Sequence, residues 1–292
     1  GCGLGPGHRR GRGGGIDAWW CGDGIDELYD MILTPEQPTL ALHARNAAES
    51  AHPELWRGLV GAWVPALGYQ GQELFNLSRN ANNGILKNDP RWTIGERGRA
   101  LSFDGVDNYV DAGEIDNVLD DSNAFAVTVW LSADSIELGD ATGGNGNTGS
   151  SLLTKTGSGG DNSFGLYLHD ANEIAVYVDT GVNLDVTTSS NAVSTSRWHY
   201  VAATYDGSFI QLYVDGKEEA ATAHTGTLVS NTNPLWIGAG RLGSTGILGI
   251  FEGDMKKVSV YNRTLTLTEI RTLYCDPLAP FRLRDDTALA TA

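Results

Sequence analysis

The feature that most constrains this fold is a series of short segments rich in β-branched and aromatic residues, separated by glycine-containing turns. After residue 100 these segments are Leu101–Asp104, Asn108–Asp111, Ala124–Ala133, Ser163–His169, Glu173–Thr180, Trp198–Tyr205, Ser208–Val214, Leu235–Ala239 and Lys257–Tyr261. Asp206-Gly207 and Asp215-Gly216 separate consecutive segments as tight hairpin turns do. Short strands with such turns predict an all-β fold in which two antiparallel sheets pack as a sandwich.

Composition divides the chain into four parts. Residues 1–15 contain eight glycines and three arginines, which predicts a flexible arm. Residues 16–55 contain short helical candidates and are too few to bury a core, so we expect an irregular accessory segment. The sandwich is expected over residues 56–275, followed by a tail over residues 276–292. The one clear helix of the sandwich region lies near its end and begins at the capping box of Thr266-Leu-Thr-Glu269.

The 292-residue chain has a formal net charge of −16, and this charge is unevenly distributed. Residues 101–196 hold fifteen acidic residues and one base, Lys155. A chain this negative repels phosphate groups, so nucleic-acid binding is not expected. No apolar run reaches the ~18 residues that a membrane-spanning helix needs. The acidic stretch fits either a solvated surface or a docking face for a basic arm.

Six segments, in this order, resemble the motifs of laminin G-like, concanavalin A-like jelly-roll domains. They are Gly58–Trp63, Asn76–Gly84, Gly98–Val110, Trp198–Gly207, Leu212–Gly216 and Val258–Leu265. The resemblance covers roughly residues 56–275 and implies a two-sheet antiparallel jelly roll. It implies no single function, because this sandwich serves many of them. Trp130, Trp198 and Trp236 lie within apolar runs, and we expect them to pack in the core.

The same resemblance bears on metal binding. Domains of this kind often hold one structural calcium through an acid in the last long strand, in a pattern close to Gly-x-Ile-Asp-x-Val-x-x-Tyr. Here the matching segment is Gly253–Tyr261, and Lys256 takes the place of that acid. An ammonium group cannot ligate a metal, so we expect a metal-free site with Lys256 as an internal cation. Asn76 and Asp254 remain candidate calcium ligands if a site survives nearby, and no other cofactor is expected.

Two neighbouring strand segments suggest a ligand-binding patch. In Ser163–His169 the side chains of Tyr167 and His169 lie on the face opposite the apolar ones, and in Glu173–Thr180 Tyr177 and Asp179 do the same. If these strands pair, Tyr167, His169, Tyr177 and Asp179 form one patch in which aromatic rings stack on sugars beside hydrogen-bonding groups. The alternative is a half-solvated outer face with ordinary tyrosines.

The sequence contains no recognisable catalytic motif. Related sandwich hydrolases carry Glu-x-Asp-x-x-Glu on one strand, and the nearest segment here, Glu114–Leu119, lacks the last acid. No Gly-x-Ser-x-Gly elbow, His-Glu-x-x-His motif or P-loop occurs. His199 is expected to be a packed or hydrogen-bonded histidine at the edge of the core. We therefore predict that the chain is not an enzyme.

Two functions fit these observations. The first is a non-catalytic recognition or adhesion module at a cell or particle surface, which binds a glycan or a surface protein. The alternative is a structural protein of a filament, fibre or virion whose N-terminal segment docks to neighbouring subunits. In that case Arg9, Arg10 and Arg12 contact an acidic surface and hold a homo-oligomer together. Both functions imply an extracellular, cell-surface or virion location.

Overall fold

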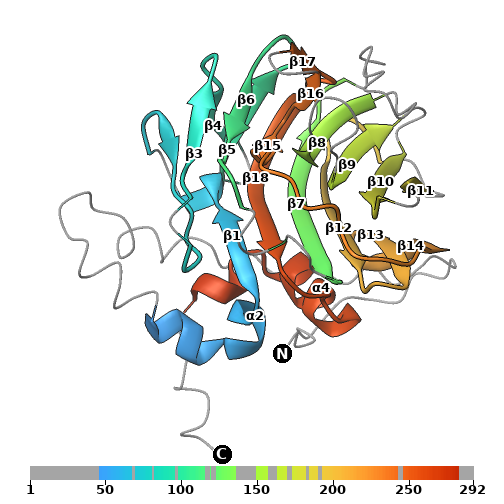
Figure 1. The fold of residues 1–292 in the computed structure, drawn as a ribbon. Helices are drawn as coiled ribbons and strands as arrows, with labels where there is room; N and C mark the ends of the chain where they lie inside the picture. Colours follow the sequence, from blue (N-terminus) through green and yellow to red (C-terminus); the bar gives the residue numbers. More distant parts are fainter. Residues whose placement is uncertain are drawn as a thin grey trace, which may run out of the picture.

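The structure, a computed structural model, describes two antiparallel sheets that lie against each other with short helices beside them (Figure 1). The described residues are 46–282, apart from residues 68–69, 81, 96–97, 116–118, 120–122, 136–148, 157–162, 170–172, 182–183, 190–192 and 243–245. The predicted arm over residues 1–15 lies outside them, as do most of residues 16–55 and of the predicted tail.

The first sheet, called sheet I below, is organised around the long strand β18. Its strands in spatial order are β14 (Lys217–Ala223), β13 (Phe209–Val214), β12 (Trp198–Tyr205), β7 (Phe125–Ala133), β18 (Glu252–Tyr261), β5 (Gly98–Asp104) and β4 (Arg91–Gly95). β1 (Leu59–Trp63) pairs with the second half of β18, on the edge where β5 pairs with the first half. β18 thereby joins strands from both ends of the domain.

The second sheet, called sheet II, is built mainly from the middle of the chain. Its strands in spatial order are β11 (Leu184–Thr188), β10 (Ile174–Asp179), β9 (Phe164–His169), β8 (Gly149–Lys155), β15 (Trp236–Ile237), β6 (Tyr109–Asp111), β3 (Gly84–Lys87) and β2 (Glu73–Leu74). The hairpin of β16 (Gly240–Leu242) and β17 (Gly246–Leu248) lies against β8, where Ser151 N donates to Gly249 O over 2.6 Å.

Alternate side chains of both sheets point inward and form one core. Sheet II contributes Phe164 and Leu166, sheet I contributes Val127 and Val129, and all four are fully buried. Successive side chains of a strand point to opposite faces, so every second residue enters the core. The predicted all-β, two-sheet jelly roll with a short C-terminal helix is confirmed.

The predicted Asp215-Gly216 turn connects β13 to β14. Val214 pairs with Lys217, which leaves two residues in the loop. Asp215 has φ of 49° and Gly216 has φ of 77°. A two-residue hairpin loop with positive φ at both positions is a type I′ turn, and Asp-Gly is among its preferred sequences.

A layer of short helices packs on part of the outer face of sheet I. It consists of residues 46–51, α2 (Pro53–Trp56), α4 (Leu267–Cys275) and the 3₁₀ helix η3 (Ala279–Phe281). Its apolar side chains pack on outward-facing residues of the sheet such as Tyr200 and Tyr261. Within this layer Trp56 contacts Phe281 edge-to-face at 5.7 Å, so segments from the two ends of the described chain meet. None of the helices in the described part of the chain is long and apolar enough to cross a membrane.

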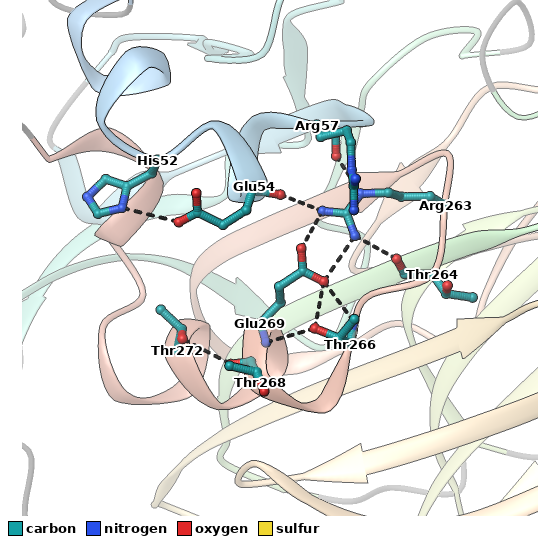
Figure 2. Close-up of polar contacts among 9 residues, drawn as sticks. All are labelled: His52, Glu54, Arg57, Arg263, Thr264, Thr266, Thr268, Glu269 and Thr272. Atoms are coloured by element: carbon teal, nitrogen blue, oxygen red, sulfur yellow. Dashed lines mark hydrogen bonds and ion pairs between the residues drawn. The ribbon is translucent and has the colours of Figure 1, made fainter. Parts of the chain in front are cut away.

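Arg263 connects the parts of this layer (Figure 2). Its guanidinium binds both carboxylate oxygens of Glu269, at 2.7 and 3.0 Å. It also donates to the backbone carbonyls of Glu54, Arg57 and Thr264 at 2.6 to 2.7 Å. A planar guanidinium suits this geometry because it presents its N–H donors as a rigid fork. The side chain thus joins the α2 segment to the turn before α4.

The predicted capping box at the start of α4 is confirmed. Thr266 Oγ1 accepts from Glu269 N, and the Glu269 carboxylate accepts from Thr266 N over 2.8 Å (Figure 2). Burial alone would raise the pKa of Glu269, but hydrogen bonds from Arg263 and Thr266 outweigh it and lower this pKa.

A β-bulge changes the orientation of β18 at Lys256. The register with β7 shifts between Met255 and Lys257, so Lys256 has no opposite residue. Met255 consequently lies in the core between the sheets, whereas Lys257 is buried beneath η3 on the outer face. A bulge inserts one residue and so inverts the facing of all that follow.

Candidate functional site

Two of the four residues predicted to bind a ligand lie together on the outer face of sheet II. β9 and β10 pair as expected, with Tyr167 opposite Ala175 and Tyr177 opposite Gly165. The rings of Tyr167 and Tyr177 stack with centroids 5.6 Å apart. Gly165 makes room for them, because a Cβ atom at this position would lie 2.5 Å from both rings. The tyrosines form a compact pair above that glycine.

The tyrosine pair is more buried than the sequence pattern indicates. Tyr167 is 7% exposed and Tyr177 is 1% exposed. Burial raises the pKa of both hydroxyls, and the proximity of Tyr167 raises that of Tyr177 further. The two side chains therefore pack on the sheet and expose little of their surface to solvent.

The other two predicted residues lie at opposite ends of this strand pair. His169 is next to Glu173, to which its backbone N–H donates over 2.6 Å, whereas Asp179 N donates to Ser163 O over 2.8 Å. Both side chains are half-buried. The strand pair separates them by about six residues, or roughly 20 Å at 3.3 Å per residue. The structure thus brings together Tyr167 and Tyr177 and keeps His169 and Asp179 apart.

A second aromatic cluster occupies the same face of sheet II. Tyr109 in β6 and Trp236 in β15 have ring centroids 4.5 Å apart, and the Arg241 guanidinium of β16 lies 5.8 Å from the Trp236 ring. Asp111 is directly opposite Trp236. Burial raises the pKa of the Tyr109 hydroxyl, Asp111 adds to this shift and Arg241 opposes it. The Tyr109 and Trp236 rings therefore lie near both an anion and a cation. We call Tyr109, Asp111, Trp236 and Arg241 the Tyr109 cluster.

The Tyr109 cluster and the tyrosine pair belong to one row across the sheet. Trp236 is opposite Thr154 of β8, Thr154 is opposite Gly165, and Gly165 is opposite Tyr177. Trp236 was expected in the core, but its neighbour Ile237 occupies the core and Trp236 faces outward. The same alternation, with Val110 facing inward, puts Tyr109 on the outer face and was already visible in the sequence.

The predicted calcium ligand Asn76 is engaged by the backbone. Its Oδ1 accepts from Ala62 N at 2.9 Å and from Ser78 N at 3.0 Å. Its Nδ2 donates to Val60 O at 3.3 Å. These bonds attach the segment after β2 to β1. They engage both the oxygen and the nitrogen of the Asn76 side-chain amide.

The other predicted ligand, Asp254, lies on a different part of β18. It is opposite Ser102 of β5 and Ser132 of β7, whereas Asn76 lies beside β1. Burial raises the pKa of Asp254, with a hydrogen bond from Ser102 opposing the shift. The two candidate ligands are therefore not brought together. No group of three or more His, Cys, Asp or Glu side chains in the described part of the chain is arranged to hold a metal ion.

Lys256, the predicted internal cation, is half-buried. Its ammonium lies 4.2 Å from the centre of the Trp198 ring. The fully buried ammonium groups belong to two other lysines. Lys257 donates to Pro277 O beneath η3, and Lys155 donates to Asn231 O at 2.7 Å and to Asn231 Oδ1 at 2.9 Å.

The predicted assembly residues Arg9, Arg10 and Arg12 lie outside the described residues. So does Asp116 of the hydrolase-like segment, while Glu114 is exposed in the loop after β6.

Comparison with known proteins identifies the family. The family model described as "Concanavalin A-like lectin/glucanases superfamily" matches residues 104–271, more than half of the chain. The chain belongs to this superfamily. No curated protein sequence matches it significantly.

Solved structures share the fold at low sequence identity. Domain 4 of AbnA, a GH43 extracellular arabinanase from Geobacillus stearothermophilus solved with arabinotriose, is 14% identical with a TM-score of 0.56, over 74% of this chain and 98% of that one. The binding domain of Paraclostridial Mosquitocidal Protein 1 is 14% identical with a TM-score of 0.57, over 75% of this chain and 52% of that one. Trypanosoma rangeli sialidase with 2,3-difluorosialic acid is 17% identical with a TM-score of 0.56, over 82% of this chain and 39% of that one.

These comparisons correct the prediction that the chain is not an enzyme. The neighbours include parts of an arabinanase and of sialidases, which are enzymes. The absence of familiar motifs was therefore an insufficient ground for excluding catalysis, because this fold occurs in enzymes as well as in lectins. The chain spans about half of the mosquitocidal structure and about two fifths of the sialidase.

Proposed function

We propose that the chain binds carbohydrate on the outer face of sheet II, with the Tyr109 cluster at the centre of the site. The observation that supports this most directly is the contact of Tyr109 with Trp236 at 4.5 Å, flanked by Asp111 and Arg241. Sugars present both an apolar face and hydroxyl groups, so a site for them combines aromatic rings with a few polar groups.

Each residue of the cluster has a distinct part in this proposal. Tyr109 is half-buried and offers the accessible ring, while Trp236 is 7% exposed and supports it from the side. The Asp111 carboxylate accepts hydrogen bonds from sugar hydroxyls, and the Arg241 guanidinium donates them. Arg241 is steadied by a 3.2 Å hydrogen bond from its Nη1 to Asn233 Oδ1.

The burial of the other outer face supports the choice of sheet II. Helices cover part of the outer face of sheet I, including Tyr200 and Tyr261. On sheet II the side chains of Ile85, Tyr109 and Asp111 remain half-buried or exposed. The carbohydrate ligand in the AbnA domain 4 structure lends further support, as does the lectin membership of the superfamily.

The test begins with a glycan array and arabinan oligosaccharides, followed by calorimetry on any ligand found. Tyr109→Ala is expected to weaken binding about fivefold or more, because stacking of one ring contributes on the order of 1 kcal/mol or more. Phe209→Ala is the matched control, since Phe209 is an exposed aromatic residue of sheet I. A wild-type protein without any array signal would overturn the proposal, as would unchanged affinity in Tyr109→Ala.

The tyrosine pair, His169 and Asp179 enter the proposal as an extension of the same site. A long oligosaccharide following the row across sheet II passes from the Tyr109 cluster toward Tyr177. The double variant Tyr167→Ala, Tyr177→Ala is then expected to have a lower affinity for a long oligosaccharide and an unchanged affinity for a disaccharide. Equal weakening of both ligands would indicate loss of packing beneath the sheet instead.

The finer functional proposals are adhesion at a cell or particle surface and self-assembly through the N-terminal segment. An exposed edge favours assembly: Ile94 on the edge strand β4 is 74% exposed. An unpaired edge strand with an exposed apolar residue is a place where another chain can add. Light scattering on the full chain and on a chain lacking residues 1–45 tests this. An oligomer lost on truncation supports assembly through the segment, and a monomer in both cases contradicts it.

A further inference from the structure

A serine in the loop before β12 contacts a histidine–aspartate pair. Ser194 Oγ lies 3.0 Å from His199 Nε2, and His199 Nδ1 lies 2.9 Å from Asp215 Oδ2. His199 is in β12, and Asp215 is in the turn after β13. Acyl-transfer enzymes of several unrelated folds use a hydroxyl, an imidazole and a carboxylate in this order.

The surrounding hydrogen bonds assign the histidine tautomer. Ser194 N–H donates to His199 Nε2 over 3.1 Å, so Nε2 carries the lone pair. Nδ1 therefore carries the proton and donates it to Asp215. The other carboxylate oxygen, Asp215 Oδ1, accepts from Tyr200 N over 2.9 Å, which fixes its orientation. This tautomer is the one in which Nε2 accepts a proton from the serine hydroxyl.

The hydroxyl of this group is accessible, and the histidine is the most buried of the three residues. Ser194 is exposed, His199 is 6% exposed and Asp215 is half-buried. A reactant reaches the hydroxyl from solvent, while the imidazole behind it is held in place by packing and by two hydrogen bonds. Preorganisation of this kind favours transfer of the serine proton to the imidazole.

We propose that Ser194 is an activated nucleophile that cleaves small carboxylic esters, with His199 as general base and Asp215 as a positioning residue. Ser194 Oγ bonds to the ester carbonyl carbon while its proton passes to Nε2. The bond from that carbon to the alcohol oxygen then breaks, and the imidazolium returns the proton to the leaving alkoxide. Water cleaves the acyl-serine by the same proton path and releases the carboxylic acid, so no cofactor is consumed.

The neighbouring residues define the substrate class. Thr195, Ser196 and Arg197 are all exposed and polar, so they offer no apolar surface to a long acyl chain. Acetyl esters are the expected substrates. Thr195 N–H follows the nucleophile, where nucleophile-elbow hydrolases have an oxyanion-binding donor, and it has no backbone acceptor among the described residues.

The first test is labelling of the full chain with a fluorophosphonate probe, followed by peptide mass spectrometry. Ser194 Oγ displaces fluoride from phosphorus, which leaves a stable adduct. The wild type and Ser196→Ala are expected to carry the adduct at Ser194, and Ser194→Ala is expected to carry none. Hydrolysis of p-nitrophenyl acetate is expected to fall at least tenfold in Ser194→Ala. Ser196→Ala is the matched control because Ser196 is an exposed serine of the same loop.

The second test separates positioning from folding. Asp215→Asn keeps an acceptor for Tyr200 N–H but no longer favours the required tautomer, so the labelling rate is expected to fall by about 10²- to 10⁴-fold. Asp215→Glu, which keeps a carboxylate, is expected to retain more of the labelling rate than Asp215→Asn. Absence of a Ser194 adduct in the wild type would overturn the proposal. Equal labelling of wild type and Asp215→Asn would also overturn it and leave a purely structural clasp.

Discussion

At the scale of single residues, the lysines show how burial changes what a charge does. Lys256 sits at the bulge and contacts the Trp198 ring, whereas Lys257, one residue later, is fully buried beneath η3. Burial lowers the pKa of Lys257 to about 7, and the nearby Asp276 partly opposes this shift. The sequence indicates two adjacent cations but not which of them becomes buried beneath η3.

Lys257 is expected to make stability depend on pH in the neutral to alkaline range. Its folded-state pKa of about 7 lies below the ordinary lysine value, so between these two values the unfolded chain binds more protons. Stability therefore rises with pH across this window. Lys257→Met is expected to stabilise the protein at pH 6 by about 1–4 kcal/mol and to lose this advantage near pH 10. Urea unfolding at both pH values measures it, and an advantage independent of pH would contradict the assignment.

At the scale of elements, local patterns predict strands well and their partners poorly. β12 has the predicted bounds, and α4 begins at the predicted capping box, because each follows from neighbouring residues. The short strands β15 and β16 have too few residues to show a period, so the Tyr109 cluster escaped prediction. Its members come from separate elements that only the sheet order brings together.

The junction of α2, β18 and α4 is expected to depend on the Arg263–Glu269 pair. Both side chains are mostly buried, with exposures of 17% and 10%. Removing one partner leaves the other charge buried, which typically costs about 3–5 kcal/mol. Arg263→Ala is thus expected to lower the melting temperature more than Arg79→Ala, whose pair with Glu49 is exposed. Equal effects of the two variants would contradict this role.

The pH response of the same junction has the same sign as that of Lys257, because both pKa values are lowered in the folded state, but it falls in the acidic range. The pKa of Glu269 is lowered in the folded state, so its contribution is present above the ordinary glutamate value. That contribution is lost as pH falls through the folded-state pKa. Glu269→Gln is expected to reduce stability at pH 7 and to approach the wild type near pH 3. A constant difference between the two pH values would count against the ion pair.

At the scale of the whole molecule, the unit that folds extends beyond the predicted sandwich of residues 56–275 on both sides. Ala48, Leu55 and Phe281 are buried in the layer that covers sheet I. A chain of residues 56–275 is expected to be less stable than one of residues 46–282, since Phe281 alone buries a contact worth about 3 kcal/mol or more. Thermal unfolding of the two chains measures this. Equal melting temperatures would support the narrower boundary.

The acidic stretch over residues 101–196 extends through both sheets, from β5 and β7 to β11. Its one base, Lys155, is enclosed by Asn231 and does not neutralise the surface. The fold followed from sequence because alternation and turns recur along the whole chain. The proposed sites did not, because each depends on tertiary contacts between residues that carry no joint pattern.

The two proposed sites lie on different sheets, and this separation makes them independently testable. Ser194 contacts His199 of β12, which contacts Asp215 in the β13–β14 turn of sheet I, whereas Tyr109 belongs to β6 of sheet II. Distant sites without shared partners contribute additively. Tyr109→Ala is therefore expected to lose carbohydrate affinity with an unchanged rate of Ser194 labelling. Ser194→Ala is expected to lose labelling with unchanged carbohydrate affinity. If either substitution altered both measurements by more than about twofold, the sites would be coupled through the core and would form one functional unit.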